Sequence, residues 1–289
     1  MATVGQWVEG ARPRTLPNAV APVLAGAGAA AAIDGFVWWQ SLLALVVAMS
    51  LIIGVNFAND YSDGVRGTDD VRVGPLRLVG SGLVRPPLVR AAAFACFGLA
   101  GVTGLVLVLA AGRWWLVLVG AACILAAWFY TGGSRPYGYS GLGEVAVFLF
   151  FGLVAVLGTL YVQSGRLTWS GAGAAVAIGS FSAAVLVSNN VRDIPTDQDT
   201  GKRTLAVRLG DRGARRLYLV LVAIPFAATV TLSVAHSWAL LGLVAAALIV
   251  RPVRLVAGGG SGRALIPVLR DTGLAMLLWA ALTGLALAI

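Results

Sequence analysis

Charged and reactive side chains are scarce in this chain of 289 residues. Asp, Glu, Lys and Arg make up 11% of the sequence, whereas a soluble domain carries about 25%. The only histidine is His236, and the two cysteines, Cys96 and Cys123, lie inside apolar runs without metal-ligand spacing. The sequence also lacks a Walker loop and a GxGxxG motif. These absences argue against a Cys/His metal centre, a Ser-His-Asp triad and the common nucleotide-binding loops.

Apolar residues fill the space that charge leaves, at 59% of the sequence and a mean hydropathy of +0.88. Runs of about 20 apolar residues, the length that crosses a bilayer as a helix, recur along the whole chain. We therefore predict an all-α membrane protein, one domain over residues 1–289, built as a bundle of nine transmembrane helices. The expected spans are residues 16–33, 38–58, 88–110, 113–131, 143–163, 170–190, 215–235, 237–256 and 271–288.

The basic residues predict how this bundle sits in the membrane. With nine spans, 19 of the 21 Lys and Arg residues fall on one side, because only Arg113 and Arg166 lie in the opposite loops. The positive-inside rule makes the rich side cytoplasmic. We expect a multi-pass protein of the cell membrane with its N-terminus inside and its C-terminus outside. Topology and contact with membrane lipid account for the net charge of +9, so we expect no nucleic-acid partner.

Acidic residues gather in two short segments that follow long apolar runs. Seven of the twelve lie within residues 60–70 and 193–199, both on the predicted cytoplasmic side. Residues four apart share one face of a helix, so Asn56 and Asp60 are expected to point together into the bundle, with Asp63 extending that face. The second segment repeats the spacing in Asn189, Asp193 and Asp197.

Carboxylates at the water end of buried helices are typical ligands of a hard divalent cation. A bound cation would also offset the unfavourable meeting of acids with the negative end of a helix dipole. The plainer alternative is that these acids only solvate cytoplasmic loops. Two matched clusters favour the metal site.

Cations lie next to the second acidic segment. Arg192 is inside it, and Lys202 and Arg203 follow Gly201, whose freedom lets the backbone approach a ligand. Acids that hold a metal beside cations that face an anion suit a diphosphate, which shares divalent cations with carboxylates. Alone, the Lys-Arg pair would be a topology signal.

A third predicted cytoplasmic segment, residues 128–139, is rich in aromatic side chains and is followed by Glu144. It is either an interfacial belt or the wall of a pocket for a planar substrate, where π faces would shield a cation. In the pocket interpretation, Arg135 would hold a substrate carboxylate. Glu144 begins an apolar span, and pairing with Arg135 or another loop arginine would satisfy it.

These motifs and the span count resemble the UbiA-type family of intramembrane aromatic prenyltransferases. The resemblance rests on Asn59-Asp60-Tyr61-Ser62-Asp63, on Asn190-Val191-Arg192-Asp193, on Gly201-Lys202-Arg203-Thr204 and on the opening Ala11-Arg12-Pro13-Arg14. It spans nearly the whole chain. The branch it most resembles transfers a polyprenyl group from polyprenyl diphosphate to 1,4-dihydroxy-2-naphthoate, with loss of diphosphate and CO₂, giving demethylmenaquinone in menaquinone biosynthesis.

The resemblance also implies roles for individual residues. Asp60, Asp63, Asp193 and Asp197 would be catalytic and would bind Mg²⁺, with Asp60 the firmest ligand of its motif and the choice between Asp63 and Asp69 open. Diphosphate would be bound by Arg12, Asn56, Asn59, Asn189, Arg192, Lys202 and Arg203. The acceptor and the carbocation would be held by Tyr61, Tyr130, Arg135, Tyr137 and Tyr139.

Other acceptors within the family, such as 4-hydroxybenzoate, haem or a phosphoribosyl compound, remain alternatives, as does a divalent-cation transporter. Transport would require polar groups that continue towards the outer side, and the dense charge is all on one side. The sequence does not identify a general base.

Overall fold

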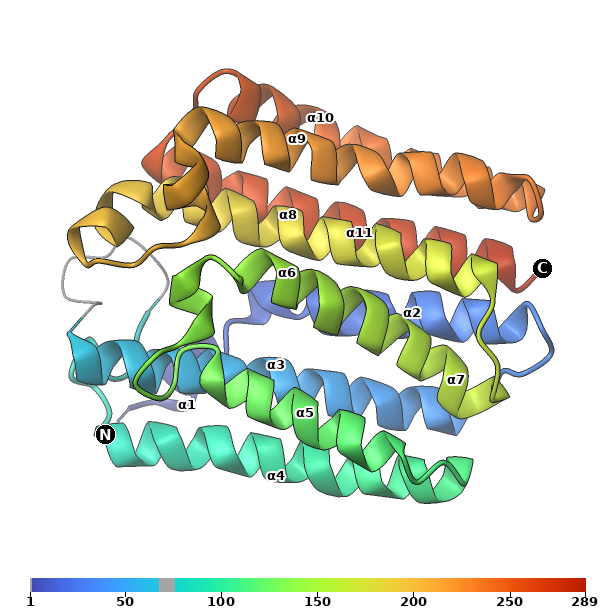
Figure 1. Cartoon of the computed structure of the whole chain (residues 1–289), viewed down its shortest axis with the longest axis horizontal. Helices are drawn as coiled ribbons and strands as arrows, with labels where there is room; N and C mark the ends of the chain where they lie inside the picture. The colour runs from blue at the N-terminus through green and yellow to red at the C-terminus, as the bar shows by residue number, and fades with distance from the viewer. Residues whose placement is uncertain (1, 68–75) are drawn as a thin grey trace.

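The computed structural model describes residues 2–67 and 76–289, and the regular structure within these ranges is entirely helical. Asp69, one candidate metal ligand, lies outside the described residues. The α-helices, labelled in Figure 1, are α1 (Val4–Gly10), α2 (Pro17–Ala31), α3 (Trp38–Arg66), α4 (Pro86–Ala111), α5 (Leu116–Phe129), α6 (Gly143–Val147), α7 (Gly158–Ser164), α8 (Trp169–Asp199), α9 (Leu205–Ser233), α10 (Ala246–Ala257) and α11 (Ile266–Leu287). A π-helical segment, Phe148–Leu157, joins α6 to α7, and 3₁₀ turns at Ser237–Ala245 and Gly262–Leu265 lead into α10 and α11.

Seven helical segments of the described chain are long and apolar enough to cross a membrane: Trp38–Arg66, Pro86–Ala111, Gly143–Ser164, Trp169–Asp199, Leu205–Ser233, Ser237–Ala257 and Gly262–Leu287. They correspond to seven of the nine expected spans. The other two, α2 with 15 residues and α5 with 14, are shorter. A membrane crossing by these two stays a prediction.

The helices α3 and α8 continue well past the ends of their expected spans. The apolar runs end near residues 58 and 190, but α3 continues to Arg66 and α8 to Asp199. The first acidic segment is therefore helical as far as Arg66 and the second throughout, and side chains four apart do share a face. Gly67 ends α3 in the left-handed conformation, with φ of 70°, which favours glycine.

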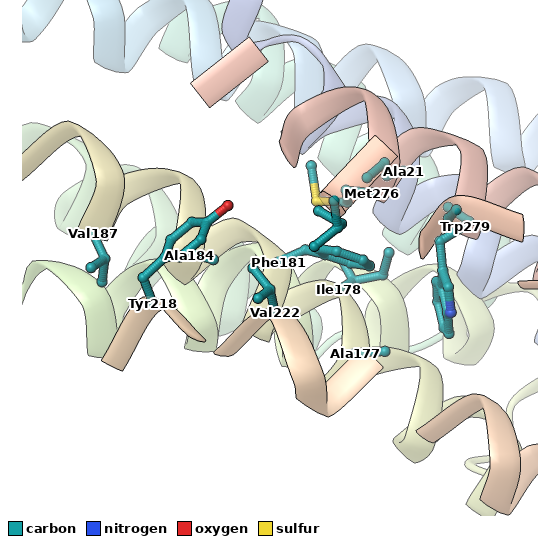
Figure 2. Close-up of a cluster of buried hydrophobic side chains, with 14 of the residues drawn as sticks. Ala21, Ala177, Ile178, Phe181, Ala184, Val187, Tyr218, Val222, Met276 and Trp279 are labelled. Carbon is teal, nitrogen blue, oxygen red and sulfur yellow. The ribbon is translucent and has the colours of Figure 1, made fainter. Parts of the chain in front are cut away.

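The core of the bundle is built around α8, the span with the largest buried share. Figure 2 shows Phe181 of α8 among Met276 and Trp279 of α11 and Val222 of α9. Small residues let the helices approach closely, as is usual for helices packed in membranes. A Cβ atom added at Gly152 would lie 2.5 Å from the Cα of Gly179, so span 143–164 and α8 touch backbone to backbone.

One end of the bundle collects the ends of several helices (Figure 1). The C-terminal ends of α3 and α8, the N-terminal end of α9 and the short helix α1 lie there, and the C-terminus of the chain lies at the opposite end. Within α9, Gly210 has φ of 67° and ψ of 170°, which breaks the helix and separates its first turn from the long span. The acidic motifs and the predicted cationic loop are thus brought to the same end.

Candidate active site

A polar pocket with a cavity volume of about 130 Å³ lies at this end. Its walls come from α3, α8, the segment before α2, and the loops that follow α3, α5 and α8. The lining residues are Arg12, Asn59, Asp63, Arg77, Tyr130, Thr131, Gly138, Tyr139, Leu186, Asn189, Asn190, Asp193, Asp197, Lys202 and Thr204. Segments far apart in sequence therefore meet around one cavity that is rich in both acids and cations.

The first acidic motif presents two faces, and only one of them lines the pocket. Asn59 and Asp63, four residues apart on α3, are on the pocket face. Asp60 points elsewhere: its carboxylate accepts hydrogen bonds from the backbone N–H groups of Leu78, at 2.7 Å, and Val79, at 3.0 Å. Although Asp60 was expected to be the firmest ligand, here it anchors the loop after α3 from outside the pocket.

Asn56 also holds a neighbouring segment. Its side-chain amide donates to the carbonyl oxygen of Ala11 and to the hydroxyl of Thr15, each at 2.9 Å. Between these two contacts lies Arg12, with φ of 56° and ψ of 70°, a left-handed conformation that is unfavourable for a residue with a side chain. Asn56 therefore fixes a strained backbone that carries Arg12 to the pocket wall.

Asp63 is the acid around which the pocket cations gather. Its carboxylate lies 3.2 Å from Nη2 of Arg77 and 3.5 Å from Nζ of Lys202, and it accepts a hydrogen bond from the hydroxyl of Tyr139. The Lys202 ammonium also lies 4.6 Å from the centre of the Tyr139 ring. Burial, and next the charge of Asp63, raise the pKa of Tyr139, so this phenol stays protonated and donates.

The second acidic motif lines the pocket along its whole length. Asp193 accepts two hydrogen bonds from its neighbour Arg192, at 2.6 and 2.7 Å, and Arg192 also donates to the Asn189 side-chain oxygen at 2.8 Å. One turn further on, Asp197 accepts from the Thr204 hydroxyl at 3.4 Å. The three acidic and amide side chains predicted from the spacing do share one face.

The turn after α8 returns Lys202 to the same cavity. Gly201 has φ of 75°, and the backbone N–H of Lys202 donates to the carbonyl oxygen of Asp197 at 2.8 Å. As a result Lys202 is buried, whereas its neighbour Arg203 is exposed. The backbone N–H of Arg203 donates to Tyr139 O, and its carbonyl oxygen accepts from Arg208. Adjacent cations in the sequence thus have different environments.

The predicted aromatic wall is divided in the same way. Tyr130 and Tyr139 line the pocket. Tyr137 donates its hydroxyl to the carbonyl oxygen of Ala126 at 2.8 Å, and Tyr61 stacks on Trp128 with ring centroids 6.2 Å apart. Neither of these two tyrosines lines the cavity, and Arg135 is exposed on the surface.

Several pocket residues were not singled out from the sequence. Arg77 belongs to a loop in which arginine is also explained by topology, so nothing marked it. Thr131 and Leu186 carry no pattern of their own, and Thr204 belongs to the motif at residues 201–204 but was given no role. Asn190 is different, because it sits inside the second motif beside Asn189 and the motif itself could have indicated it.

The chemistry of the donors suits a hard divalent cation held together with a phosphate ligand. No group of three His, Cys, Asp or Glu side chains in the described ranges forms a ready metal site. However, Mg²⁺ is usually bound by only one or two carboxylates together with substrate phosphates. Asp63, Asp193 and Asp197, with the amide oxygens of Asn59 and Asn189, surround one pocket and supply such oxygens.

Comparisons with known proteins agree with this chemistry. A family model described as the UbiA prenyltransferase family matches residues 19–259. Over 288 residues the chain is 59% identical to 1,4-dihydroxy-2-naphthoate octaprenyltransferase of Mycobacterium tuberculosis, covering 100% of this chain and 98% of that protein. It is 38% identical over 282 residues to the protein of the same name from Escherichia coli, covering 92% of this chain and 89% of that protein. The structure of a UbiA homolog from Archaeoglobus fulgidus bound to GPP and Mg²⁺ superimposes on this chain with a TM-score of 0.71. The match covers 98% of this chain and 99% of that chain at 15% sequence identity, so the two proteins share the fold.

Proposed function

The chain belongs to the UbiA prenyltransferase family, and we propose that it transfers a polyprenyl group from polyprenyl diphosphate to 1,4-dihydroxy-2-naphthoate. Diphosphate and CO₂ leave, and the product is demethylmenaquinone in its reduced form, an intermediate of menaquinone biosynthesis. The observation that carries this proposal is the identity of 59% over the whole chain to a 1,4-dihydroxy-2-naphthoate octaprenyltransferase. The polar pocket supplies groups suited to each step.

We place the enzyme in the cell membrane with nine spans, the N-terminus inside and the pocket facing the cytoplasm. Two observations support this orientation. Of the 21 basic residues, only Arg113 and Arg166 belong to the loops of the other side, and α1 lies at the pocket end while the C-terminus lies at the opposite end (Figure 1). Ends on opposite sides are expected from an odd number of crossings, and the basic side is expected to be cytoplasmic.

Mg²⁺ would be held by Asp63, Asp193 and Asp197, with help from the amide oxygens of Asn59 and Asn189. When bound, the ion supplies charge neutralisation for the diphosphate leaving group. Asp60 is not in this set, because it does not line the pocket and its carboxylate accepts from two backbone N–H groups instead. Its loop instead carries Arg77 to the pocket.

The cations of the pocket would bind and orient the diphosphate. Arg12, Arg77 and Lys202 line the cavity, and Arg192 is oriented beside it by Asp193 and Asn189. As the allylic C–O bond breaks, negative charge grows on the departing diphosphate. Cations already fixed in place stabilise that charge more strongly than they stabilise the bound substrate.

The aromatic side of the pocket would serve the other half of the reaction. Tyr130 and Tyr139, both half-buried, offer π faces that stabilise the allylic cation, and the part of each ring that is buried limits the access of water. A ring carbon of the acceptor then forms the new C–C bond, and loss of CO₂ restores the aromatic ring. Arg203 and Arg135 are exposed, and we assign neither to this step.

The prenyl tail would lie largely outside the polar pocket. Sites for drug-sized ligands have volumes of about 300–1,000 Å³, and this cavity has about 130 Å³. The cavity therefore suits the diphosphate and the reacting atoms, and a long apolar chain must continue along apolar helices. No sequence motif is required for that part of the substrate.

The proposal is tested by incubating the purified protein with Mg²⁺, a polyprenyl diphosphate and labelled 1,4-dihydroxy-2-naphthoate. We expect a prenylated and decarboxylated product that mass spectrometry identifies. The same assay with 4-hydroxybenzoate serves as the comparison for acceptor choice. Absence of product from the naphthoate, with product from another aromatic acid, would move the enzyme to a different branch of the family.

A further inference from the structure

Glu144 is a buried acid that the proposed reaction does not use. It lies in the first turn of α6, is 5% exposed, and accepts a hydrogen bond on Oε1 from the side-chain amide of Asn190 at 2.8 Å. The expected pairing with a loop arginine is not seen among the described residues, where Arg135 is exposed and no ion pair reaches this carboxylate. In the part of the chain that the structure describes, its other oxygen, Oε2, is buried without a hydrogen-bond partner. A buried acid that is only half satisfied is costly and marks a candidate functional site.

The partner of Glu144 is a pocket residue. Asn190 is 8% exposed and lines the cavity together with Tyr130 and Leu186. An amide side chain can be turned either way, and the two orientations place either NH₂ or oxygen towards a neighbour. The carboxylate accepts only from the NH₂ group, because two facing oxygens would repel each other. Glu144 therefore fixes the orientation in which Asn190 Oδ1 is turned away from it and is left to accept.

The wall of the pocket beside Asn190 includes the ring of Tyr130. A Cβ atom at Gly138 would lie 3.1 Å from Cζ of Tyr130, and one at Gly143 would lie 3.1 Å from the Tyr130 hydroxyl. The two glycines thus let Tyr130 pack closely against the backbone at these two positions. Unlike Arg12, Arg77 and Lys202 elsewhere in the cavity, this wall is neutral where it meets the pocket.

We infer that Glu144 is a positioning residue, which locks Asn190 so that Oδ1 accepts a hydrogen bond from a hydroxyl group of the aromatic acceptor. The inference rests on the proposed function, because it takes the acceptor to be a dihydroxy aromatic acid. A neutral oxygen acceptor distinguishes a phenolic hydroxyl from a carboxylate, which the pocket cations would bind. Glu144 acts through Asn190 and does not touch the substrate.

The test measures the KM of the acceptor and the KM of the prenyl diphosphate separately. Asn190→Ala removes the acceptor atom, and Glu144→Leu releases the amide; we expect each to raise the acceptor KM about tenfold, the effect of one good hydrogen bond. The KM of the prenyl diphosphate should stay within about twofold of the wild type. Glu144→Gln still offers an oxygen to the Asn190 NH₂ group, so it should restore most of the acceptor affinity. Glu9→Gln, at an exposed acid of α1, is the matched control and should match the wild type.

Two further measurements separate this role from a general effect on folding. The double variant Glu144→Leu with Asn190→Ala should be no worse than Asn190→Ala alone, because both changes remove the same contact. The mono-O-methyl ethers of 1,4-dihydroxy-2-naphthoate should discriminate as well. At least one ether should bind the wild type more weakly than the parent acid, and Asn190→Ala should lose that preference.

Several outcomes would overturn the inference. An unchanged acceptor KM in Asn190→Ala, additive effects in the double variant, or equal rises in both KM values in Glu144→Leu would each do so. If Glu144→Leu does not fold, Asn190→Ala and Glu144→Gln still decide the question. A wild type that fails to prenylate the naphthoate would instead defeat the proposed function, before any variant is compared.

Discussion

Asp60 and Asp63 belong to one motif, but the structure predicts that their loss has different consequences. In Asp60→Ala, the backbone N–H groups of Leu78 and Val79 lose their acceptor. Leu78 is fully buried and Val79 is half-buried. A hydrogen bond to a charged group contributes about 1.5–3 kcal/mol, and water can replace part of the bond to Val79. We therefore expect a loss of about 3 kcal/mol in the free energy of unfolding, counting one bond fully and the other in part.

The assay is thermal unfolding of the purified protein in detergent, with and without Mg²⁺ and a prenyl diphosphate. A loss of about 3 kcal/mol lowers the Tm by roughly 5 °C in a protein of this size. Ligands that bind only the folded state raise the Tm. Asp60→Ala should therefore start from a lower Tm and still show the rise on ligand addition.

Asp63→Asn is the matched comparison, because Asp63 faces the pocket from the same helix. This variant keeps the shape of the side chain and loses the charge that would hold the metal-bound diphosphate. We expect it to lose both turnover and the rise in Tm on ligand addition. The reasoning would be refuted if Asp60→Ala kept the wild-type Tm and lost the ligand response, since Asp60 would then bind the ligand itself.

Three further predictions concern other parts of the site and the core. Lys202→Met should lower kcat/KM about a hundredfold through lost stabilisation of the leaving group, while Arg203→Met, at an exposed neighbour, should stay close to the wild type. Equal losses of kcat/KM in the two variants would contradict the placement of Lys202. Asn56→Leu should raise the KM of the prenyl diphosphate about tenfold, because two hydrogen bonds that hold the Arg12 segment are lost. A change in the acceptor KM alone would contradict a role of Asn56 in holding Arg12 at the diphosphate site. Gly152→Ala should prevent α8 from packing against the span 143–164, since the new Cβ would lie 2.5 Å from Gly179 Cα, whereas a Cβ at Gly158 meets open space. Size-exclusion chromatography should therefore show folded protein for Gly158→Ala and not for Gly152→Ala.

Much of the fold was predictable because the apolar runs and the turns between them are local features of the sequence. Seven of the expected spans have helices of sufficient length and apolar character. What hydropathy missed was the continuation of α3 and α8 beyond the apolar runs, to Arg66 and Asp199. These last turns are polar, and they are stabilised by contacts around the pocket, which hydropathy does not register.

The site was predictable only as far as helical spacing reaches. Both Asn56 with Asp60 and Asn59 with Asp63 satisfy a spacing of four residues. A shift of three residues turns a side chain by only about 60° around the helix, so the two faces are neighbours and spacing cannot choose between them. Which face lines the pocket depends on the loop that carries Leu78 and on the segment that carries Arg12. Both segments are placed by tertiary contacts, which helical spacing does not predict. The second motif has no such rival segment, and its predicted face is the observed one.

As an expected membrane span, the short helix α5 would make the geometry of the pocket depend on the thickness of the surrounding bilayer. Its 14 residues span only about 21 Å, against a hydrocarbon core of about 30 Å. Aromatic side chains mark both of its ends, with Trp114 and Trp115 before it and Phe129 at its last position, all three exposed, and such side chains settle at the headgroup level. In the expected nine-span arrangement, the bilayer beside α5 would thin to meet it. Because α5 leads directly into Tyr130, a crossing by α5 would transmit a mismatch with longer acyl chains to the aromatic wall of the pocket. We therefore expect turnover to fall as membranes of increasing thickness are used for reconstitution.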